Sequence, residues 1–234
     1  MTKVLATKTS LTIDDGPKAP SKRLSLRDMA YEAIKHQIVT CELKPGEALT
    51  VNELAKAFDL GRTPVIQAID RLTIEGLVMV MPRKGVVVSP VSLDDFVAII
   101  EMRLLNEGRA ARWAAERAGD TEINRMKANL DATWRAAKRG NITDFIALDR
   151  EFHRFVAQAT RNSILSEFLA KLHDKSFRFW FISLRAPDHN FRVSEQHAAI
   201  LEGIRKHDPK VAEKAMRDHI SSFRTNATSQ ILRS

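Results

Sequence analysis

Four residues in the second half of the chain have side chains that commonly bind divalent metal ions in proteins. Asp149 and His153 are four positions apart, so on a helix both side chains emerge on one face. His197 lies about ten residues before, and His219 about eleven residues after, a predicted turn at residues 206–209. If the two flanking helices fold back there, both imidazoles lie at one height. We expect the four residues to bind Zn²⁺, with Ni²⁺, Mn²⁺ or Fe²⁺ as alternatives.

The remaining histidines and the large apolar residues have simpler interpretations. A single histidine in a helical bundle is more often a hydrogen-bonded core residue than a metal ligand, so the metal hypothesis depends on the four residues together. We expect the other histidines at surface or boundary positions: His36, His173, His189 and His207. The aromatic residues of this half are interpreted as bundle core, not as a cofactor-stacking site: Trp113, Trp134, Phe145, Phe152, Phe155, Phe177 and Trp180.

The four candidate ligands belong to a helical half of the chain. From Leu93 onward, strand signals are absent, and apolar residues recur at helical spacing. Asp208-Pro209 combines an N-cap residue with a proline at the first helical position, which marks a sharp helix start. The pattern predicts an antiparallel all-α bundle. Its six expected helices cover residues 93–118, 121–139, 143–160, 163–184, 191–206 and 209–231.

The first half has a different pattern, which predicts a winged helix-turn-helix in a mainly α protein. Thr50 and Glu53 have the spacing of a capping box, and Thr63-Pro64 is expected to open the next helix with proline at its first position. Two short apolar runs then flank a basic turn that contains Gly85, which is typical of a β-hairpin. The expected elements are helices at 25–40, 51–58 and 64–75, then strands at 77–81 and 86–88.

Polar residues on two of these elements have the types that contact DNA. The start of the third helix and the tip of the hairpin are the parts that a winged helix-turn-helix presents to the major groove and to the backbone or minor groove. The candidate contacts are Arg62, Thr63 and Gln67 on the helix, and Arg83 and Lys84 on the hairpin. The alternative for any one of them alone is an ordinary solvated side chain.

Composition restricts the class of protein without identifying it. The formal net charge of +8 permits an anionic partner, yet residues 1–91 hold 13 Lys and Arg against 10 Asp and Glu, so the charge is not concentrated there. No run approaches the roughly 18 apolar residues of a membrane span. The single cysteine, Cys41, and the absence of a secretory signal favour the cytoplasm. We expect a flexible arm at 1–23, a DNA-binding domain at 24–91 and a helical domain at 92–234.

Residues 24–91 resemble the GntR family of bacterial regulators almost continuously. The resemblance is carried by the turn that ends at Gly46, by Leu54-Ala55, by Leu60-Gly61-Arg62-Thr63-Pro64-Val65 and by Arg71-Leu72-Thr73-Ile74-Glu75-Gly76-Leu77 with Gly85. The chain departs from the family where Gly61 replaces the usual Ser, where Ile66-Gln67 replaces Arg-Glu, and at Asn52, where a charged residue is common. That arginine commonly touches DNA in the family, so the departure bears on the operator sequence and not on the motif.

Residues 93–230 resemble the metal-binding helical ligand domain (FCD) of the FadR subgroup of this family. The motifs are Asp149-Arg150-Glu151-Phe152-His153 followed by Asn162, then His197-Ala198-Ala199-Ile200 and Met216-Arg217-Asp218-His219-Ile220. The resemblance implies that the Asp and three His bind the ion and that a small carboxylate takes its open positions. It also implies an effector contact by Arg103, within Glu101-Met102-Arg103, and another by Asn162. A helix-surface ion pair is the alternative for Arg103.

These observations predict a regulator and not an enzyme. We expect a cytoplasmic homodimer that binds a palindromic double-stranded DNA operator, usually as a repressor, and does not bind membranes. A small organic or sugar acid bound at the metal would change its operator affinity. One alternative is a metal-dependent hydrolase or lyase, since an Asp-His₃ ion can activate water, although no partner acid-base group is evident. The other is a regulator whose metal is purely structural.

Overall fold

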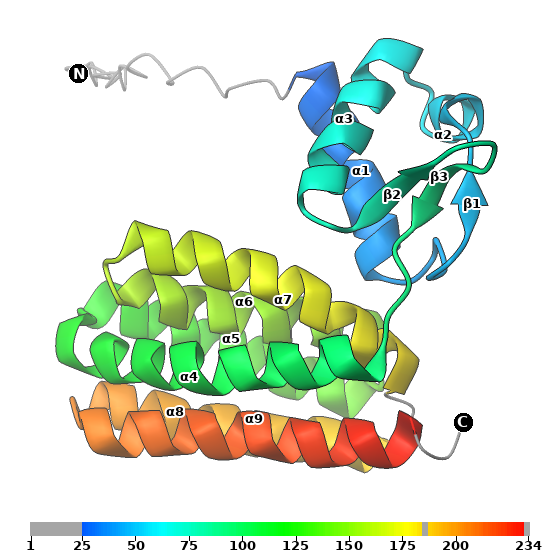
Figure 1. Ribbon diagram of the computed structural model, residues 1–234. Helices are drawn as coiled ribbons and strands as arrows, with labels where there is room; N and C mark the ends of the chain where they lie inside the picture. The colour runs from blue at the N-terminus through cyan, green and yellow to red at the C-terminus, as the bar shows by residue number, and fades with distance from the viewer. Residues whose placement is uncertain (1–24, 184–186, 232–234) are drawn as a thin grey trace, which may run out of the picture.

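The computed structural model describes residues 25–183 and 187–231, in which a small winged unit precedes a larger helical bundle (Figure 1). The expected mainly α fold class is therefore confirmed. The winged unit consists of α1 (Leu26–Val39), β1 (Ala48–Leu49), α2 (Val51–Ala57), α3 (Arg62–Ile74), β2 (Val78–Met81) and β3 (Gly85–Val88). The bundle consists of α4 (Leu93–Arg117), α5 (Asp120–Arg139), α6 (Ile142–Ala159), α7 (Ser163–Ser183), α8 (Pro187–Arg205) and α9 (Pro209–Ile231). The expected arm at 1–23 lies outside the described residues.

Capping side chains begin the first two helices of the winged unit. Ser25 accepts a hydrogen bond from the Asp28 amide at the start of α1. At the start of α2, Thr50 and Glu53 form the reciprocal capping box that their spacing predicts. The apolar faces of the three helices meet the sheet in one core, which includes these residues: Ile34, Leu54, Val65, Leu72 and Val88.

The recognition helix α3 begins two residues earlier than the sequence predicts. Gly61 has an extended backbone (φ −68°, ψ 159°) and serves as N-cap, so Arg62 is the first helical residue and Pro64 the third. The prediction that Pro64 occupies the first position is therefore wrong. Proline is tolerated at the third position for the same reason as at the first, because the amides of the first turn have no intrahelical acceptor.

The sheet is antiparallel and has the strand order β1-β3-β2, with Met81 opposite Gly85 at the turn of the β2–β3 hairpin. Gly85 has a left-handed backbone (φ +78°), and a Cβ atom there would lie 2.8 Å from the Leu49 carbonyl oxygen. The hairpin was expected, but β1 was not. Its two residues, Ala48 and Leu49, are too few to show any alternation in the sequence.

The bundle packs α4 against α9 and α8 against α9, with α5 and α6 alongside (Figure 1). Its apolar core includes Phe96, Phe145, Phe152, Ile200 and Phe223. Helix α8 begins at Pro187, four residues before the expected start at 191, because proline fits the first position of a helix. Among the described helices, none is long and apolar enough to cross a bilayer.

Most of the expected core aromatics lie in or against this core. Phe145, Phe152 and Phe177 are buried in it, and Trp134 and Phe155 pack against it partly buried. Trp113 is half-buried, with the Arg117 guanidinium 4.7 Å from its ring centroid. The side chain of Trp180 lies outside those that the structure describes.

Candidate metal centre and nucleic-acid surface

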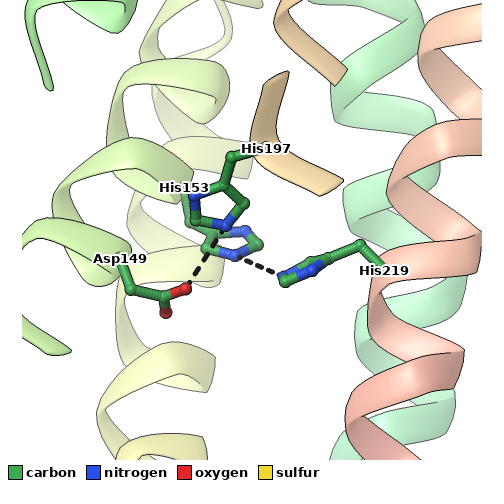
Figure 2. A group of neighbouring side chains, drawn as sticks. All are labelled: Asp149, His153, His197 and His219. Atoms are coloured by element: carbon green, nitrogen blue, oxygen red, sulfur yellow. Dashed lines mark hydrogen bonds and ion pairs between the residues drawn. The ribbon is translucent and has the colours of Figure 1, made fainter. Parts of the chain in front are cut away.

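The four residues singled out for metal chemistry converge in the interior of the bundle (Figure 2). Asp149 and His153 project from adjacent turns of α6, His197 from α8 and His219 from α9. Each offers one ligand atom, and these four atoms lie within 4.8 Å of one another. None of the four residues is more than 2% exposed. A small ion could therefore contact all of them without contacting bulk water.

Two local features of the backbone bring these side chains together. The four-residue spacing on α6 places Asp149 and His153 on one face of the helix. The α8–α9 pair is close because Gly203 faces Ala212, where a Cβ atom on the glycine would lie 2.7 Å from the Ala212 nitrogen. The His197 and His219 ring centroids are consequently 4.9 Å apart.

The contacts among the four residues leave buried polar atoms unsatisfied. The Nε2 atoms of His153 and His219 face each other at 3.2 Å, and the His197 Nε2 lies 3.3 Å from the Asp149 Oδ1. Within the described part of the chain, neither His197 nitrogen nor the Asp149 Oδ1 has a hydrogen-bond partner. Buried polar atoms without partners are costly. A divalent cation would accept lone pairs from these atoms, so this donor set of three imidazoles and one carboxylate fits such an ion.

The pKa shifts at the cluster favour the protonation states that bind metals. Burial lowers the pKa of His219 well below its usual range, and the neighbouring His197 and His153 lower it further. Burial also lowers the pKa of His153, although the Glu107 carboxylate opposes this. Burial alone would raise the pKa of Asp149, but its histidine neighbours hold it below its usual value. His153 and His219 are therefore neutral at pH 7, and the carboxylate is ionised.

Glu107 on α4 lies directly behind His153, and sequence reasoning missed it. Its Oε2 is 2.5 Å from the His153 Nδ1, the nitrogen that points away from the four-residue cluster. Its Oε1 is 3.0 Å from the Nε2 of His173, so Glu107, His153 and His173 form a second buried group. A carboxylate behind a metal-binding histidine fixes its ring and tautomer. The available signal was the four-residue spacing of Arg103 and Glu107 on the apolar face of α4.

The structure contradicts the expectation that His173 is a surface or boundary residue. It is 3% exposed, because its face of α7 turns toward Glu107 in the interior. His36 and His207 are exposed, as expected. His189 belongs to α8, but its side chain lies outside those that the structure describes.

The two residues proposed for an effector are placed differently. Arg103 is buried, with its Nε 2.5 Å from a Glu107 oxygen and its NH1 3.0 Å from the Ser176 Oγ. An ion pair, the alternative to an effector contact for Arg103, therefore exists, but in the interior next to the cluster and not on the helix surface. Asn162 precedes α7, where its side-chain oxygen accepts the Leu165 amide at 3.0 Å. Among the described residues, no hydrogen bond or ion pair joins Asn162 to the four-residue cluster.

The five candidate DNA contacts are all exposed on the winged unit. Arg62, Thr63 and Gln67 lie in the first two turns of α3, and Arg83 and Lys84 lie at the turn between β2 and β3. Ile66 shares this part of α3 and is 43% exposed. The structure thus presents a helix N-terminus and a basic hairpin tip to solvent, which are the two parts that a winged helix-turn-helix applies to DNA.

Comparison with known proteins identifies relatives of both parts of the chain. Residues 26–88 match the family described as bacterial regulatory proteins, gntR family, and residues 98–222 match the FCD domain. The HTH-type transcriptional repressor NanR of Cronobacter sakazakii is 31% identical in an alignment of 234 positions. This alignment covers 88% of this chain and 86% of that protein. NanR of Escherichia coli K12 is 29% identical over 229 residues, covering 87% and 84%.

Solved structures show the same fold. E. coli McbR/YncC superposes with a TM-score of 0.82 at 20% sequence identity, covering 89% of this chain and 99% of that one. A GntR regulator from Rhodococcus sp. RHA1 superposes with a TM-score of 0.76 at 16% identity, covering 87% and 97%. At such identities the likeness concerns the fold alone.

Proposed function

The chain belongs to the GntR family of bacterial regulatory proteins and has an FCD domain, and on this premise we propose that it is a transcriptional repressor controlled by a small carboxylate. One observation carries the proposal: the buried convergence of Asp149, His153, His197 and His219 in the same chain as an exposed recognition helix. Residues 24–91 would bind DNA, and residues 92–234 would bind the effector and dimerise. The repressor role is inferred for this chain because its NanR relatives are named transcriptional repressors.

In this proposal the protein acts in the cytoplasm as a homodimer on a palindromic operator. Two copies of α3 would enter successive major grooves, with Arg62 and the β2–β3 turn contacting bases or phosphates. Symmetry of the protein then requires two-fold symmetry of the operator. An effector changes operator affinity only by as much as it binds one dimer geometry better than the other.

Asp149, His153, His197 and His219 would hold a divalent ion, for which Zn²⁺ suits the nitrogen-rich donor set. When bound, such an ion would act as a Lewis acid toward the oxygen atoms of an organic or sugar acid, provided that its coordination expands beyond the four protein ligands. The surrounding apolar residues exclude water, and Phe152 stacks on the His197 ring with centroids 4.1 Å apart, which orients it. Arg103 adds positive charge beside the cluster.

Binding, and not turnover, is the role that the surroundings of the cluster favour. Hydrolysis at a metal centre needs a free acid-base group close to the reacting water. Glu107 is the carboxylate next to the cluster, and Arg103, His153 and His173 already surround it. The relatives named above are regulators as well.

A thermal-shift screen tests the proposed control by a carboxylate. Full-length protein is loaded with Zn²⁺ and heated with a panel of small organic and sugar acids, and metal-free protein is the control. At 100 times its dissociation constant, a ligand adds about 2.7 kcal/mol of stability, which raises the Tm by about 5–10 °C. We expect such a shift only in the presence of Zn²⁺, and the same acid should change DNA binding in a mobility-shift assay. Equal shifts without metal would contradict the proposed site.

Glu107→Gln tests the carboxylate behind His153. Gln keeps the size of Glu but removes the charge that faces the His153 Nδ1 and the Arg103 guanidinium. We expect Zn²⁺ affinity, measured by competition with a chromophoric chelator, to fall about 10- to 100-fold. Glu116→Gln is the matched control, because Glu116 is an exposed residue of the same helix. Equal loss of affinity in both variants would argue against a specific role for Glu107.

A further inference from the structure

The winged unit contacts the bundle where α1 meets α7. At the end of α1, Val39 is 4% exposed and packs into the apolar core of the bundle. One turn earlier, the Lys35 Nζ lies 2.5 Å from the Asp174 Oδ2 of α7. The exposed fractions of these two side chains are only 12% and 4%. The unit is therefore held to the bundle by an ion pair that water screens little.

On the winged side, Lys35 is connected through Tyr31 and Glu75 to the end of the recognition helix α3. Its Nζ lies 2.7 Å from the Tyr31 hydroxyl and 3.1 Å from the Glu75 Oε2. The Tyr31 hydroxyl also donates to a Glu75 oxygen at 2.7 Å. Glu75 is the C-cap residue of α3, and the guanidinium of Arg71, on the last turn of that helix, stacks 3.5 Å from the Tyr31 ring centroid. A displacement of Lys35 therefore acts directly on the C-terminal end of α3.

On the bundle side, two routes lead from the four-residue cluster to Asp174. In the first, Glu107 bridges His153 and His173, and His173 directly precedes Asp174 in α7. In the second, Arg150, the residue after Asp149, pairs with the Asp174 Oδ1. Consecutive residues of α7 thus have different partners: His173 contacts Glu107 of α4, and Asp174 contacts both Arg150 of α6 and Lys35 of α1. Both routes end on one carboxylate.

We propose that Asp174 and Lys35 are positioning residues that transmit the state of the metal centre to the recognition helix. This inference rests on the proposed function, because it needs a ligand at the four-residue cluster. A ligand that pulls α6 against α8 and α9 shifts His153 and Arg150, and both shifts reach Asp174. The ion pair with Lys35 is short and shielded, so it favours one placement of α1 and α3 over others. Residues 89–92, which connect β3 to α4, are then not the only route by which the bundle acts on the winged unit.

Hydrogen exchange with Zn²⁺ alone tests the relay, because it requires neither the operator nor the effector. Full-length protein is compared with and without Zn²⁺, and amide exchange is followed by mass spectrometry. In the natural protein, Zn²⁺ should slow exchange in α6, α8 and α9, around the centre. It should also slow exchange in α1 and the last turn of α3, by about 5-fold or more, the lower end of typical allosteric coupling.

Lys35→Met is the principal variant, since Met keeps the length and apolar stem of Lys but not its charge. It leaves Asp174 paired with Arg150, so no buried charge is stranded. We expect this variant to bind Zn²⁺ at full stoichiometry and to keep the slowed exchange in α6, α8 and α9. In α1 and α3, Zn²⁺ should slow exchange by less than about 2-fold. Lys35→Arg should retain the response. Lys214→Met is the matched control, because Lys214 forms an exposed ion pair with Asp218 on α9.

The outcomes separate the relay from the proposed function. If Zn²⁺ protects nothing in the natural protein, the metal site itself is wrong, and the relay loses its premise. If the centre is protected but α1 and α3 do not respond, only the relay is refuted. The relay is also refuted if Zn²⁺ slows exchange in α1 and α3 of Lys35→Met as much as in the natural protein. Should that variant unfold, Lys35→Met combined with Asp174→Asn removes both charges and allows the same comparison.

Discussion

Replacing both His153 and His197 with alanine is expected to abolish stoichiometric metal binding. These residues come from different helices and supply two of the four ligand atoms that lie within 4.8 Å of one another. Zn²⁺ binding by four protein ligands is worth about 10–16 kcal/mol, so loss of two ligands removes roughly half of it. The affinity should then fall by about 10⁴-fold or more. Elemental analysis after gel filtration should find about one ion per natural chain and close to none in the double variant.

The control for this experiment must separate lost ligands from lost fold. His36→Ala removes a histidine that is exposed on α1, far along the chain from the cluster, and it should leave the metal content unchanged. Both proteins should unfold cooperatively in urea without added metal. A double variant that folds and still holds one ion per chain would show that the ion binds elsewhere.

The fold was predictable because its signals are local. The capping box of Thr50 and Glu53 and the proline at position 209 each depend on a few neighbouring residues, and the helix bounds follow them. The errors have local causes too. Proline is tolerated anywhere in a first helical turn, so Pro64 marked a start without giving its residue. Pro187 was assigned to the preceding turn, although it is itself the first residue of α8.

The candidate site was predictable only where helix geometry relates its residues. Asp149 and His153 share a face because of their spacing, and His197 and His219 were matched by counting from the turn between their helices. Glu107 and His173 could not be found in this way. They meet His153 only because α4, α6 and α7 pack together, and the sequence carries no periodic signal for contacts among three helices.

Arg62→Ala is expected to weaken operator binding, and in the proposed homodimer the loss occurs twice. Arg62 is the first residue of α3, where the amide groups and the helix dipole favour a phosphate and where the side chain can also reach a base edge. A guanine contact is worth about 1–3 kcal/mol, so loss of two copies should weaken binding about 30-fold or more. The operator can be selected from random duplexes with the natural protein and then used in mobility shifts.

Arg205→Ala serves as the control, because Arg205 is an exposed arginine at the end of α8 and pairs only with Glu202 and solvent among its described contacts. It removes the same charge from the protein without touching the winged unit. If general attraction to DNA were responsible, both variants would weaken binding equally. An Arg62→Ala protein with natural affinity would refute the contact itself.

Two further measurements decide what Arg62 touches. Loss of a phosphate contact weakens binding to all sequences and reduces the slope of log affinity against log salt by about one per contact, or about two per dimer. Loss of a base contact instead relaxes the preference at one position of each half-site. Arg62→Lys separates the cases independently, since lysine keeps the charge but not the planar fork that pairs with guanine. Ile66 cannot donate a hydrogen bond from the same exposed face, so we expect discrimination by α3 to depend strongly on Arg62.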